Sequence, residues 1–262
     1  MRPSDFDNEM RKHECFHNQR VVPGAHIIVR VDGVAFHTVT KGLDKPFCAG
    51  LHKTMLETAA TMLEKLGGVY AYTQSDEISV LLPKDTELYD RQAEKLVSVA
   101  ASHAAVCVML GFMRDTLESD VPWSVRPIPE VAFDARLWIG TSDSDVIDYF
   151  RWRQEDAARN CALAHRYWAL RRSGMSPARC ASTLSGVSHK QLLDGLDLGN
   201  VPSWQLLGVG VRREYYSKQC VNKKTGEPTV ARRRRTVFDS NLPRRDDYST
   251  YIWDRLGEDC TR

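Results

Sequence analysis

Two apolar stretches that end in acidic residues constrain the fold of this 262-residue chain more than any other feature. The first runs from Ile27 to Val31 and ends in Asp32-Gly33. The second begins at Tyr70 and surrounds the acidic pair Asp76-Glu77. Apolar runs of this length, bounded by turn residues, predict buried strands. Carboxylates at the ends of two neighbouring strands are the oxygen ligands that Mg²⁺ prefers, so the pattern indicates a metal site.

The periodicity between residues 25 and 139 predicts the element order β-α-β-β-α-β. The expected segments are a strand over 25–32, a helix over 48–66, strands over 69–72 and 78–82, a helix over 88–113 and a strand over 131–139. This order is typical of ferredoxin-like and polymerase-palm domains, which are α+β folds. In such a fold helices cover one face of an antiparallel sheet, and we expect the other face to stay open for a nucleotide.

The second half of the chain predicts a helical part and a basic extension. A capping-rich start at 142–145 predicts a helix to about residue 172. Shorter helices are expected over 177–184 and near 189–193, followed by a strand-like segment over 206–216, a hairpin over 221–235 and a polar tail from 239. We therefore divide the chain into an N-terminal arm (1–24), a palm core (25–140), a helical part (141–205) and a basic hairpin with tail (206–262).

Positive charge is concentrated in this last part. The net charge of the chain is only +2, but residues 212–245 hold eleven Lys or Arg against three acids. A local excess of this size predicts contact with a polyanion. The candidate residues are Arg212, Arg213, Lys223, Lys224, Arg232, Arg233, Arg234 and Arg235.

Cysteine usage and the N-terminus predict the compartment. The seven cysteines are odd in number and form no Cys-x-x-Cys pair, which favours reduced thiols in the cytoplasm. The first residues lack an apolar signal-peptide core, and no run approaches 18 apolar residues. We expect neither a signal peptide nor a membrane span.

The acidic strand ends suggest a particular chemistry. A two-metal site holds its ions roughly 3.5–4 Å apart and clamps the attacking and leaving oxygens of a phosphoryl or nucleotidyl transfer. Asp32 and Asp76 suit the role of metal ligands, with the Gly33 carbonyl as a further ligand. A strict pleat points Glu77 to the other side of the sheet from Asp76, so we expect Asp76 to be the direct ligand.

The turn that follows Asp32 is a candidate phosphate cradle. Successive backbone amides from Gly33 to His37 can form an anion-binding nest. Lys45 and Lys95 are basic side chains that can reach phosphate charge, although Lys95 lies on a helix that begins with polar residues typical of a solvated surface.

Four motifs in order resemble those of tRNA-His guanylyltransferase and its Thg1-like relatives. They are Arg30-Val31-Asp32-Gly33 with Phe36-His37, Gln74-Ser75-Asp76-Glu77, Phe133-Asp134-x-Arg136, and Trp152-Arg153-Gln154-x-Asp156. The likeness covers roughly residues 8–205. It implies a palm domain that adds nucleotides to the 5′ end of tRNA in the 3′–5′ direction. A nucleoside triphosphate first activates the 5′-phosphate, and the 3′-hydroxyl of GTP then attacks it.

The resemblance also implies roles for single residues. Asp32, the Gly33 carbonyl and Asp76 match the ligands of two Mg²⁺ ions, and Glu77 matches a residue required for activity. Lys190, with Lys45 and Lys95, aligns with residues that contact triphosphate or tRNA. The implied nucleotide-binding residues are Asp32, Gly33, Val34, Ala35, Phe36, His37, Lys45, Ser75, Asp76 and Lys95. Members of the family form dimers or tetramers, so a homo-oligomer is expected.

Two departures from the family pattern affect the expected substrate. Members that act strictly on tRNA-His carry a His-Ile-Asn-Asn block shortly after the Trp-Arg-Gln motif, where this chain has Ala158-Arg159-Asn160-Cys161. The missing block is typical of the Thg1-like branch, which refills 5′-truncated tRNAs and is favoured here. Val34 stands where an arginine is common.

Two other classes of protein share the predicted element order. A nucleotidyl cyclase of the diguanylate type would carry Gly-Gly-Asp/Glu-Glu-Phe at the second hairpin, and Gln74 to Ile78 does not match that motif. A non-catalytic RNA-binding module would stack bases on aromatic residues of the sheet. The acids at the strand ends disfavour that module, because they repel RNA when no metal is bound.

Overall fold

The structure is a computed structural model of the full chain, and it describes residues 3–14, 17–117, 130–194, 196, 199–221, 224 and 226–259. Its centre is one six-stranded antiparallel sheet in the order β4-β1-β3-β2-β5-β6. The strands are β1 (His26–Gly33), β2 (Tyr70–Gln74), β3 (Glu77–Leu81), β4 (Phe133–Gly140), β5 (Val209–Val221) and β6 (Pro228–Asp239). The first four strands, with the helices between them, confirm the predicted β-α-β-β-α-β order and the α+β class.

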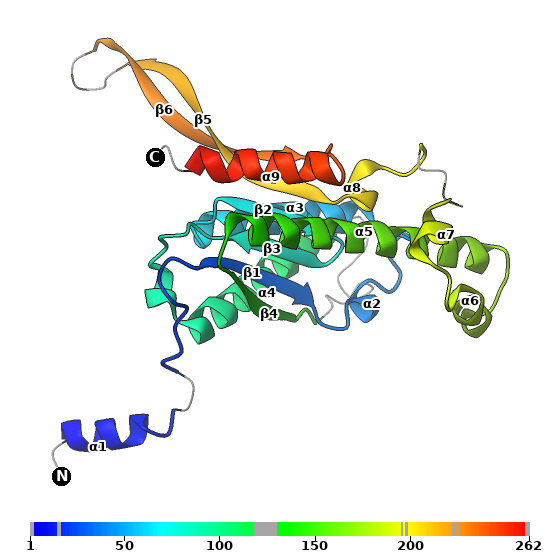
Figure 1. The fold of residues 1–262 in the computed structure, drawn as a ribbon, viewed down its shortest axis with the longest axis horizontal. Helices are drawn as coiled ribbons and strands as arrows, with labels where there is room; N and C mark the ends of the chain where they lie inside the picture. Colours follow the sequence, from blue (N-terminus) through cyan, green and yellow to red (C-terminus); the bar gives the residue numbers. More distant parts are fainter. Residues whose placement is uncertain are drawn as a thin grey trace.

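The first face of the sheet is covered by α3 (Ala49–Lys65) and α4 (Ala93–Leu117) (Figure 1). Ile27, Val29 and Val31 alternate along β1 and are fully buried against these helices. The segment Ala93–Asp115 of α4 has the length and composition of a membrane span, with a mean hydropathy of 2.0. This corrects the expectation that no segment meets that criterion. The helix packs on α3, β1 and β4.

The second face of the sheet is also covered, in contrast to the open face that we expected. Helices α5 (Asp143–Arg172) and α9 (Asp246–Asp259) lie across it. Ile28, Tyr70 and Tyr72 point to this face, where they pack with residues of both helices in a second core. The reason lies in the sequences of β1 and β2. Each strand carries apolar side chains on both of its faces, so both faces of the sheet must be buried away from water.

The second core also corrects the prediction for the C-terminus. The polar tail expected from residue 239 contains helix α9, whose Tyr248 and Ile252 are buried. These residues are four apart and so lie on one face of the helix, and the Tyr248 hydroxyl is 3.2 Å from that of Tyr70. Two buried positions therefore hold a mostly polar helix in place.

Shorter helices complete the fold. The predicted start of α5 is confirmed, since Ser142 and Asp145 form a reciprocal capping box. The remaining elements are α1 (Pro3–Arg11), α2 (Phe36–Val39), the 3₁₀ turn η1 (Leu88–Arg91), α6 (Pro177–Leu184), α7 (His189–Asp194) and α8 (Ser203–Leu206).

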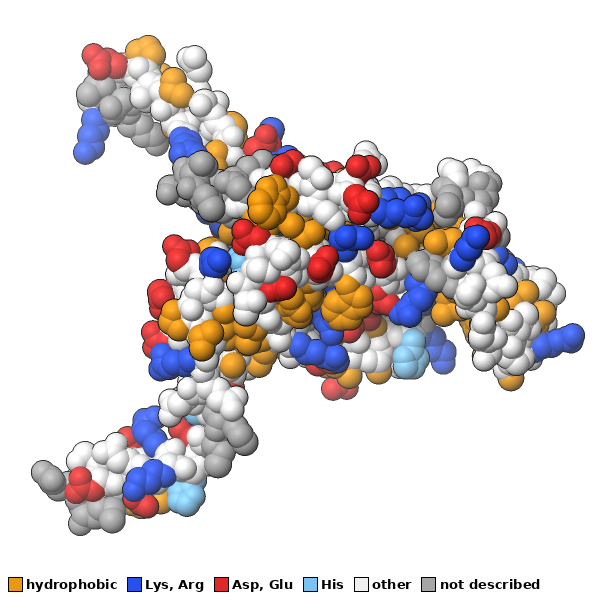
Figure 2. Space-filling model, in the orientation of Figure 1, with side chains coloured by type: hydrophobic (Ala, Val, Ile, Leu, Met, Phe, Trp, Pro, Cys, Tyr) orange, Lys and Arg blue, Asp and Glu red, His pale blue; other side chains and the backbone are white. Residues whose placement is uncertain are grey.

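The basic extension is continuous with the palm sheet. β5 pairs with β2 through Val209 to Arg212, and beyond that point β5 and β6 continue together as a two-stranded ribbon. Figure 1 shows this hairpin leaving the body at the end opposite α2. Figure 2 shows it as a protruding arm, while acidic and basic side chains are interspersed over the neighbouring α5 and α9.

Candidate functional site

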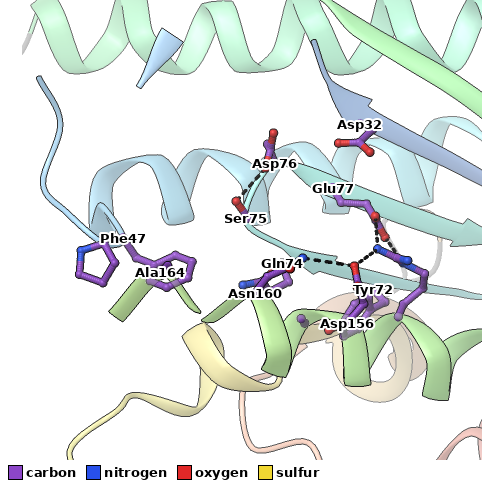
Figure 3. A pocket seen from close by; sticks show the side chains of 13 residues that line it. Asp32, Phe47, Tyr72, Gln74, Ser75, Asp76, Glu77, Asp156, Asn160 and Ala164 are labelled. Carbon is purple, nitrogen blue, oxygen red and sulfur yellow. Dashed lines mark hydrogen bonds and ion pairs between the residues drawn. The ribbon is translucent and has the colours of Figure 1, made fainter. Parts of the chain in front are cut away.

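A cleft of about 300 Å³ lies where β1 ends and β2 turns into β3, next to the middle of α5 (Figure 3). It brings together four predicted site residues, namely Asp32, Ser75, Asp76 and Glu77. The other lining residues are Pro46, Phe47, Tyr72, Gln74, Arg153, Asp156, Ala157, Asn160 and Ala164. Carboxylates therefore gather where β1 ends and β2 turns into β3.

Backbone geometry fixes the two predicted metal ligands. The Gly33 amide donates a hydrogen bond of 3.2 Å to the Asp76 carbonyl, which ties the end of β1 to the β2–β3 turn. Ser75 has φ of 56°, the left-handed conformation that a two-residue hairpin turn requires. Its hydroxyl donates a hydrogen bond of 2.7 Å to the Asp76 carboxylate. Asp32 and Asp76 thus lie on adjacent strand ends, as predicted.

The electrostatics of this pair suit a cation. Burial raises the pKa of Asp76, and the nearby negative charge of Asp32 raises it further. A divalent ion between the two carboxylates would relieve both effects, and an all-oxygen donor set is what Mg²⁺ prefers. Among the residues that the structure describes, no cluster of three or more His, Cys, Asp or Glu is arranged to hold a metal. The pair of carboxylates that lines the cleft, Asp32 and Asp76, fits Mg²⁺, which takes one or two carboxylates and completes its shell with water or phosphate.

Glu77 has a different environment from Asp76. It accepts two hydrogen bonds from Arg153, of 2.7 Å at Nε and 2.6 Å at Nη2. Burial raises the pKa of Glu77, while the Arg153 guanidinium opposes that shift. The pleat argument separated these two acids, and in the structure Glu77 turns to α5 and forms this ion pair.

The turn from Gly33 to His37 is shaped by packing. A Cβ on Gly33 would lie 2.3 Å from the ring of Phe36, so only glycine fits there. Phe36 is buried against Phe133 at 5.4 Å, and Ala35 has φ of 50°. Val34 and His37 are exposed. The turn lies beside the cleft, but its residues after Asp32 do not line it.

A smaller pocket of about 80 Å³ adjoins the cleft and shares Ser75 and Phe47 with it. Lys45 lines this pocket and donates a hydrogen bond of 3.1 Å to the Thr40 hydroxyl. The same pocket contains His52, whose ring stacks on Trp204 at 4.0 Å. Burial lowers the pKa of His52 to about 4, so the ring is neutral at physiological pH. Lys45 thus lies beside the acidic cleft, and its contact with phosphate stays a prediction.

The remaining predicted residues lie away from the cleft. Lys95 is in the first turn of α4, one turn from Arg91, which lines a cavity at the opposite end of β1. The structure therefore does not bring Lys95 to the cleft. Lys190 is exposed on α7.

The basic hairpin residues also lie away from the cleft, and Lys223 falls outside the described residues. Arg212 and Arg213 are half-buried at the base of the hairpin, while Lys224 is exposed. Arg232 stacks on Tyr215 at 4.2 Å. Four successive residues in the middle of β6 are exposed, namely Arg232, Arg233, Arg234 and Arg235.

Sequence reasoning missed several residues that line the cleft. Arg153 and Asp156 belong to the tryptophan motif, but periodicity alone places them on an exposed helix. Tyr72 and Asn160 were not predicted as site residues, although Asn160 belongs to the altered block 158–161. Tyr72 is buried, and its hydroxyl donates a hydrogen bond of 3.0 Å to the Leu207 carbonyl. The burial of Tyr70 and Tyr72 beneath α5 and α9 also removes these sheet aromatics as stacking surfaces for an RNA-binding module.

Comparisons with known proteins agree on one family. The sequence profile described as "Thg1: tRNAHis guanylyltransferase" matches residues 7–140. A probable tRNA(His) guanylyltransferase of Mus musculus is 32% identical over 169 residues, which is 63% of this chain and 55% of that protein. The tRNA(His) guanylyltransferase of Candida glabrata is 31% identical over 174 residues, 63% of this chain and 70% of that protein. The chain spans about half the length of the mouse and human proteins that it matches.

Solved structures extend the likeness to most of the chain. A bacterial tRNA(His) guanylyltransferase (Thg1)-like protein in complex with ATP superposes with a TM-score of 0.74 at 26% identity, covering 96% of this chain and 99% of that one. The same kind of protein in complex with GTP gives a TM-score of 0.71 at 25% identity, with the same coverage.

Proposed function

This chain belongs to the tRNAHis guanylyltransferase (Thg1) family, and on that basis we propose that it is a nucleotidyltransferase that adds nucleotides to the 5′ end of tRNA in the 3′–5′ direction. The observation that carries the proposal is the pair of carboxylates, Asp32 and Asp76, at one strand end in a cleft lined by Ser75. The ATP- and GTP-bound relatives support GTP and ATP as the nucleotides.

In the proposed reaction, an oxygen of the tRNA 5′-monophosphate attacks the α-phosphorus of ATP and releases pyrophosphate. The 3′-hydroxyl of GTP then attacks the activated 5′-phosphate and releases AMP, and the hydroxyl proton passes to solvent. Two Mg²⁺ ions, when bound, would supply charge stabilisation for the attacking and leaving oxygens. Asp32, Asp76 and the Gly33 carbonyl would hold them.

Other residues of the cleft position the nucleotide in this proposal. Lys45 and the Ser75 hydroxyl lie in the adjoining pocket, where they can bind a triphosphate. The ring of Phe47 is shared by both pockets and provides an apolar surface for a base. Glu77 is held by Arg153 and supports the turn rather than the nucleotide.

We propose 5′-truncated tRNA, rather than tRNA-His alone, as the preferred substrate. Residues 158–161 occupy the place of the histidine block on α5. Ala158 and Cys161 are buried, while Asn160 lines the cleft. Ala158 and Cys161 offer no polar group to recognise a particular base, and Asn160 alone of these four residues lines the cleft, which supports addition directed by a template strand.

The basic hairpin is proposed to bind the tRNA backbone far from its 5′ end. β5 leaves the cleft end of the sheet at Val209, opposite Thr73 of β2, and continues to Val221. At about 3.3 Å per residue this distance is roughly 40 Å. Replacement of Arg233 and Arg234 with Gln should therefore weaken tRNA binding and lower the salt slope by roughly one unit per lost contact.

The matched control for the hairpin removes the same charge at the end of α1, as Arg11→Gln with Lys12→Gln. Filter binding of one tRNA between 50 and 200 mM salt, roughly the range over which phosphate contacts are resolved, compares the variants. Equal salt slopes for the hairpin variant and the wild-type protein would remove the hairpin from the proposed RNA contact.

We also propose that the protein is a cytoplasmic homo-oligomer, a dimer or tetramer, on the basis of the family. Light scattering coupled to gel filtration tests the assembly, and a monomeric mass at micromolar concentration would contradict it. Fractionation of the source cells tests the compartment.

One assay decides the proposed function. The protein is incubated with Mg²⁺, GTP and ATP and with two substrates, a full-length tRNA-His and a tRNA that lacks its first nucleotide. Addition to the truncated tRNA, with less or none to tRNA-His, is expected. Addition to neither substrate would overturn the proposal, and addition to tRNA-His alone would overturn the proposed substrate.

A further inference from the structure

Asp32 has a carboxylate on each side of it across the sheet. The β1–β3 register places Glu77 directly opposite Asp32, and the β1–β4 register places Asp134 opposite it on the other side. Directly opposed residues of antiparallel strands point to the same face, with Cβ atoms about 4.5–5.5 Å apart. Both neighbours are paired with arginine, Asp134 with Arg136 at 3.3 Å and Glu77 with Arg153 at 2.6 Å.

The Glu77–Arg153 pair is the stronger of these two. Its side chains are only 14% and 11% exposed, and the guanidinium makes two parallel hydrogen bonds to the carboxylate. Asp134 and Arg136 are 49% and 61% exposed and share a single contact. Bidentate arginine–carboxylate pairs that are shielded from water fix geometry, while exposed single contacts do so weakly.

Arg153 is itself held from two further directions. It contacts the Asp156 carboxylate at 3.0 Å, one helical turn along α5, and its guanidinium lies 4.4 Å from the centre of the Trp152 ring. α5 is a long helix anchored by a capping box at its start. Arg153 therefore has one defined position, and so has the carboxylate that it binds.

We propose that Arg153 is a positioning residue that keeps Glu77 from joining Asp32 and Asp76 as a third carboxylate ligand. The inference deepens the proposed function and rests on it for the identity of the metal. Mg²⁺ in nucleotidyl transfer needs open positions for phosphate oxygens and water. A third carboxylate would occupy one of these positions and would favour ions that accept more oxygen ligands.

The test measures metal binding without nucleotide or tRNA. Mn²⁺ serves as the probe. The electron paramagnetic resonance signal of the free ion gives its free concentration, and water-proton relaxation gives the number of water molecules bound to the ion. In Arg153→Gln, Mn²⁺ should bind roughly tenfold more tightly, because a carboxylate beside the site loses its partner. The bound ion should also lose one water ligand to Glu77.

The double variant Arg153→Gln with Glu77→Gln should regain that water, since the amide is a weak ligand. The matched control is Arg159→Gln, which removes an arginine from the same helix that contacts Asp156 but not Glu77. It should leave affinity and water count as in the wild-type protein. If Arg153→Gln does not fold, Arg153→Lys replaces it, because a lysine cannot make the parallel pair of hydrogen bonds.

An unchanged water count in Arg153→Gln would overturn the proposal, even with tighter binding, because loss of a nearby positive charge alone would explain the affinity. Absence of Mn²⁺ binding to the wild-type protein would overturn it as well. The two experiments can fail separately. If the tRNA assay shows no nucleotide addition but Arg153→Gln loses one bound water as predicted, this inference stands and only the reaction assigned to the site is overturned.

Discussion

Replacement of Arg91 with Met should destabilise the protein without affecting the acidic cleft. Arg91 is only 3% exposed and lies at the end of the sheet opposite Asp32. It donates hydrogen bonds of 2.8–3.2 Å to five backbone carbonyls, those of Val21, Val22, Ala25, Lys84 and Thr86. The side chain thus joins the segment before β1 to the segment before α4.

The magnitude follows from which of these bonds are buried. The bonds to Val21 and Ala25 are buried, while those to Val22, Lys84 and Thr86 are only partly buried, so water can replace Arg91 at these three carbonyls. Two buried hydrogen bonds to a charged group contribute about 3–6 kcal/mol together. For a chain of this size, the midpoint of thermal unfolding should fall by at least roughly 6 °C.

Urea unfolding of Arg91→Met gives this free energy directly. The control is Arg20→Met in the segment before β1. Arg20 forms an ion pair of 3.3 Å with Asp90, and because the two side chains are 50% and 75% exposed, this pair contributes about 1 kcal/mol or less. Mn²⁺ binding at the cleft should be unchanged in both variants. Equal urea midpoints for the two variants would refute the assignment of Arg91 as the link between these segments.

Three further changes test local features. Burial lowers the pKa of His52 to about 4, below its unfolded value of about 6.5. Between these two values the unfolded chain binds more protons than the folded chain, so the stability of the fold decreases as the pH drops through this window. His52→Phe should remove that pH dependence when urea unfolding is measured at pH 7 and 4.5, and an unchanged dependence would contradict the assignment. Gly208→Ala should lower thermal stability more than Gly174→Ala: both glycines have positive φ, but a Cβ on Gly208 would lie 2.6 Å from Tyr72 and one on Gly174 would meet open space. Ser142→Ala should cost about 0.5–2 kcal/mol in urea unfolding through loss of the α5 cap, and no loss would contradict the capping box.

The palm was predictable because its signals are local. Alternating apolar residues defined β1, the glycines at 67–68 ended α3, and the polar start at Ser142 defined α5. The closeness of Asp32 and Asp76 could be predicted from the element order, because adjacent antiparallel strands bring these two residues to the same edge of the sheet. These inferences need only periodicity and turn chemistry.

What was not predictable depends on packing between distant segments. α9 has a weak apolar pattern, and it forms because Tyr248 and Ile252 fill the face of the sheet that holds Tyr70. Helix propensity does not reveal such a partner. The Glu77–Arg153 pair is likewise a contact across 76 positions, which no local pattern encodes. The position of Lys95 away from the cleft was not predictable either, because the sequence does not give the direction in which α4 crosses the sheet.

The central claim is that Asp32 and Asp76 together carry nucleotide addition. The most direct measurement is the single-turnover rate of GTP addition to 5′-truncated tRNA by the wild-type protein, Asp76→Asn and the control Asp85→Asn, which changes an exposed acid at the far cavity. Loss of a metal ligand should lower the rate of Asp76→Asn by roughly a thousandfold or more, while Asp85→Asn keeps the wild-type rate. A rate for Asp76→Asn within about tenfold of the wild-type protein would contradict the account.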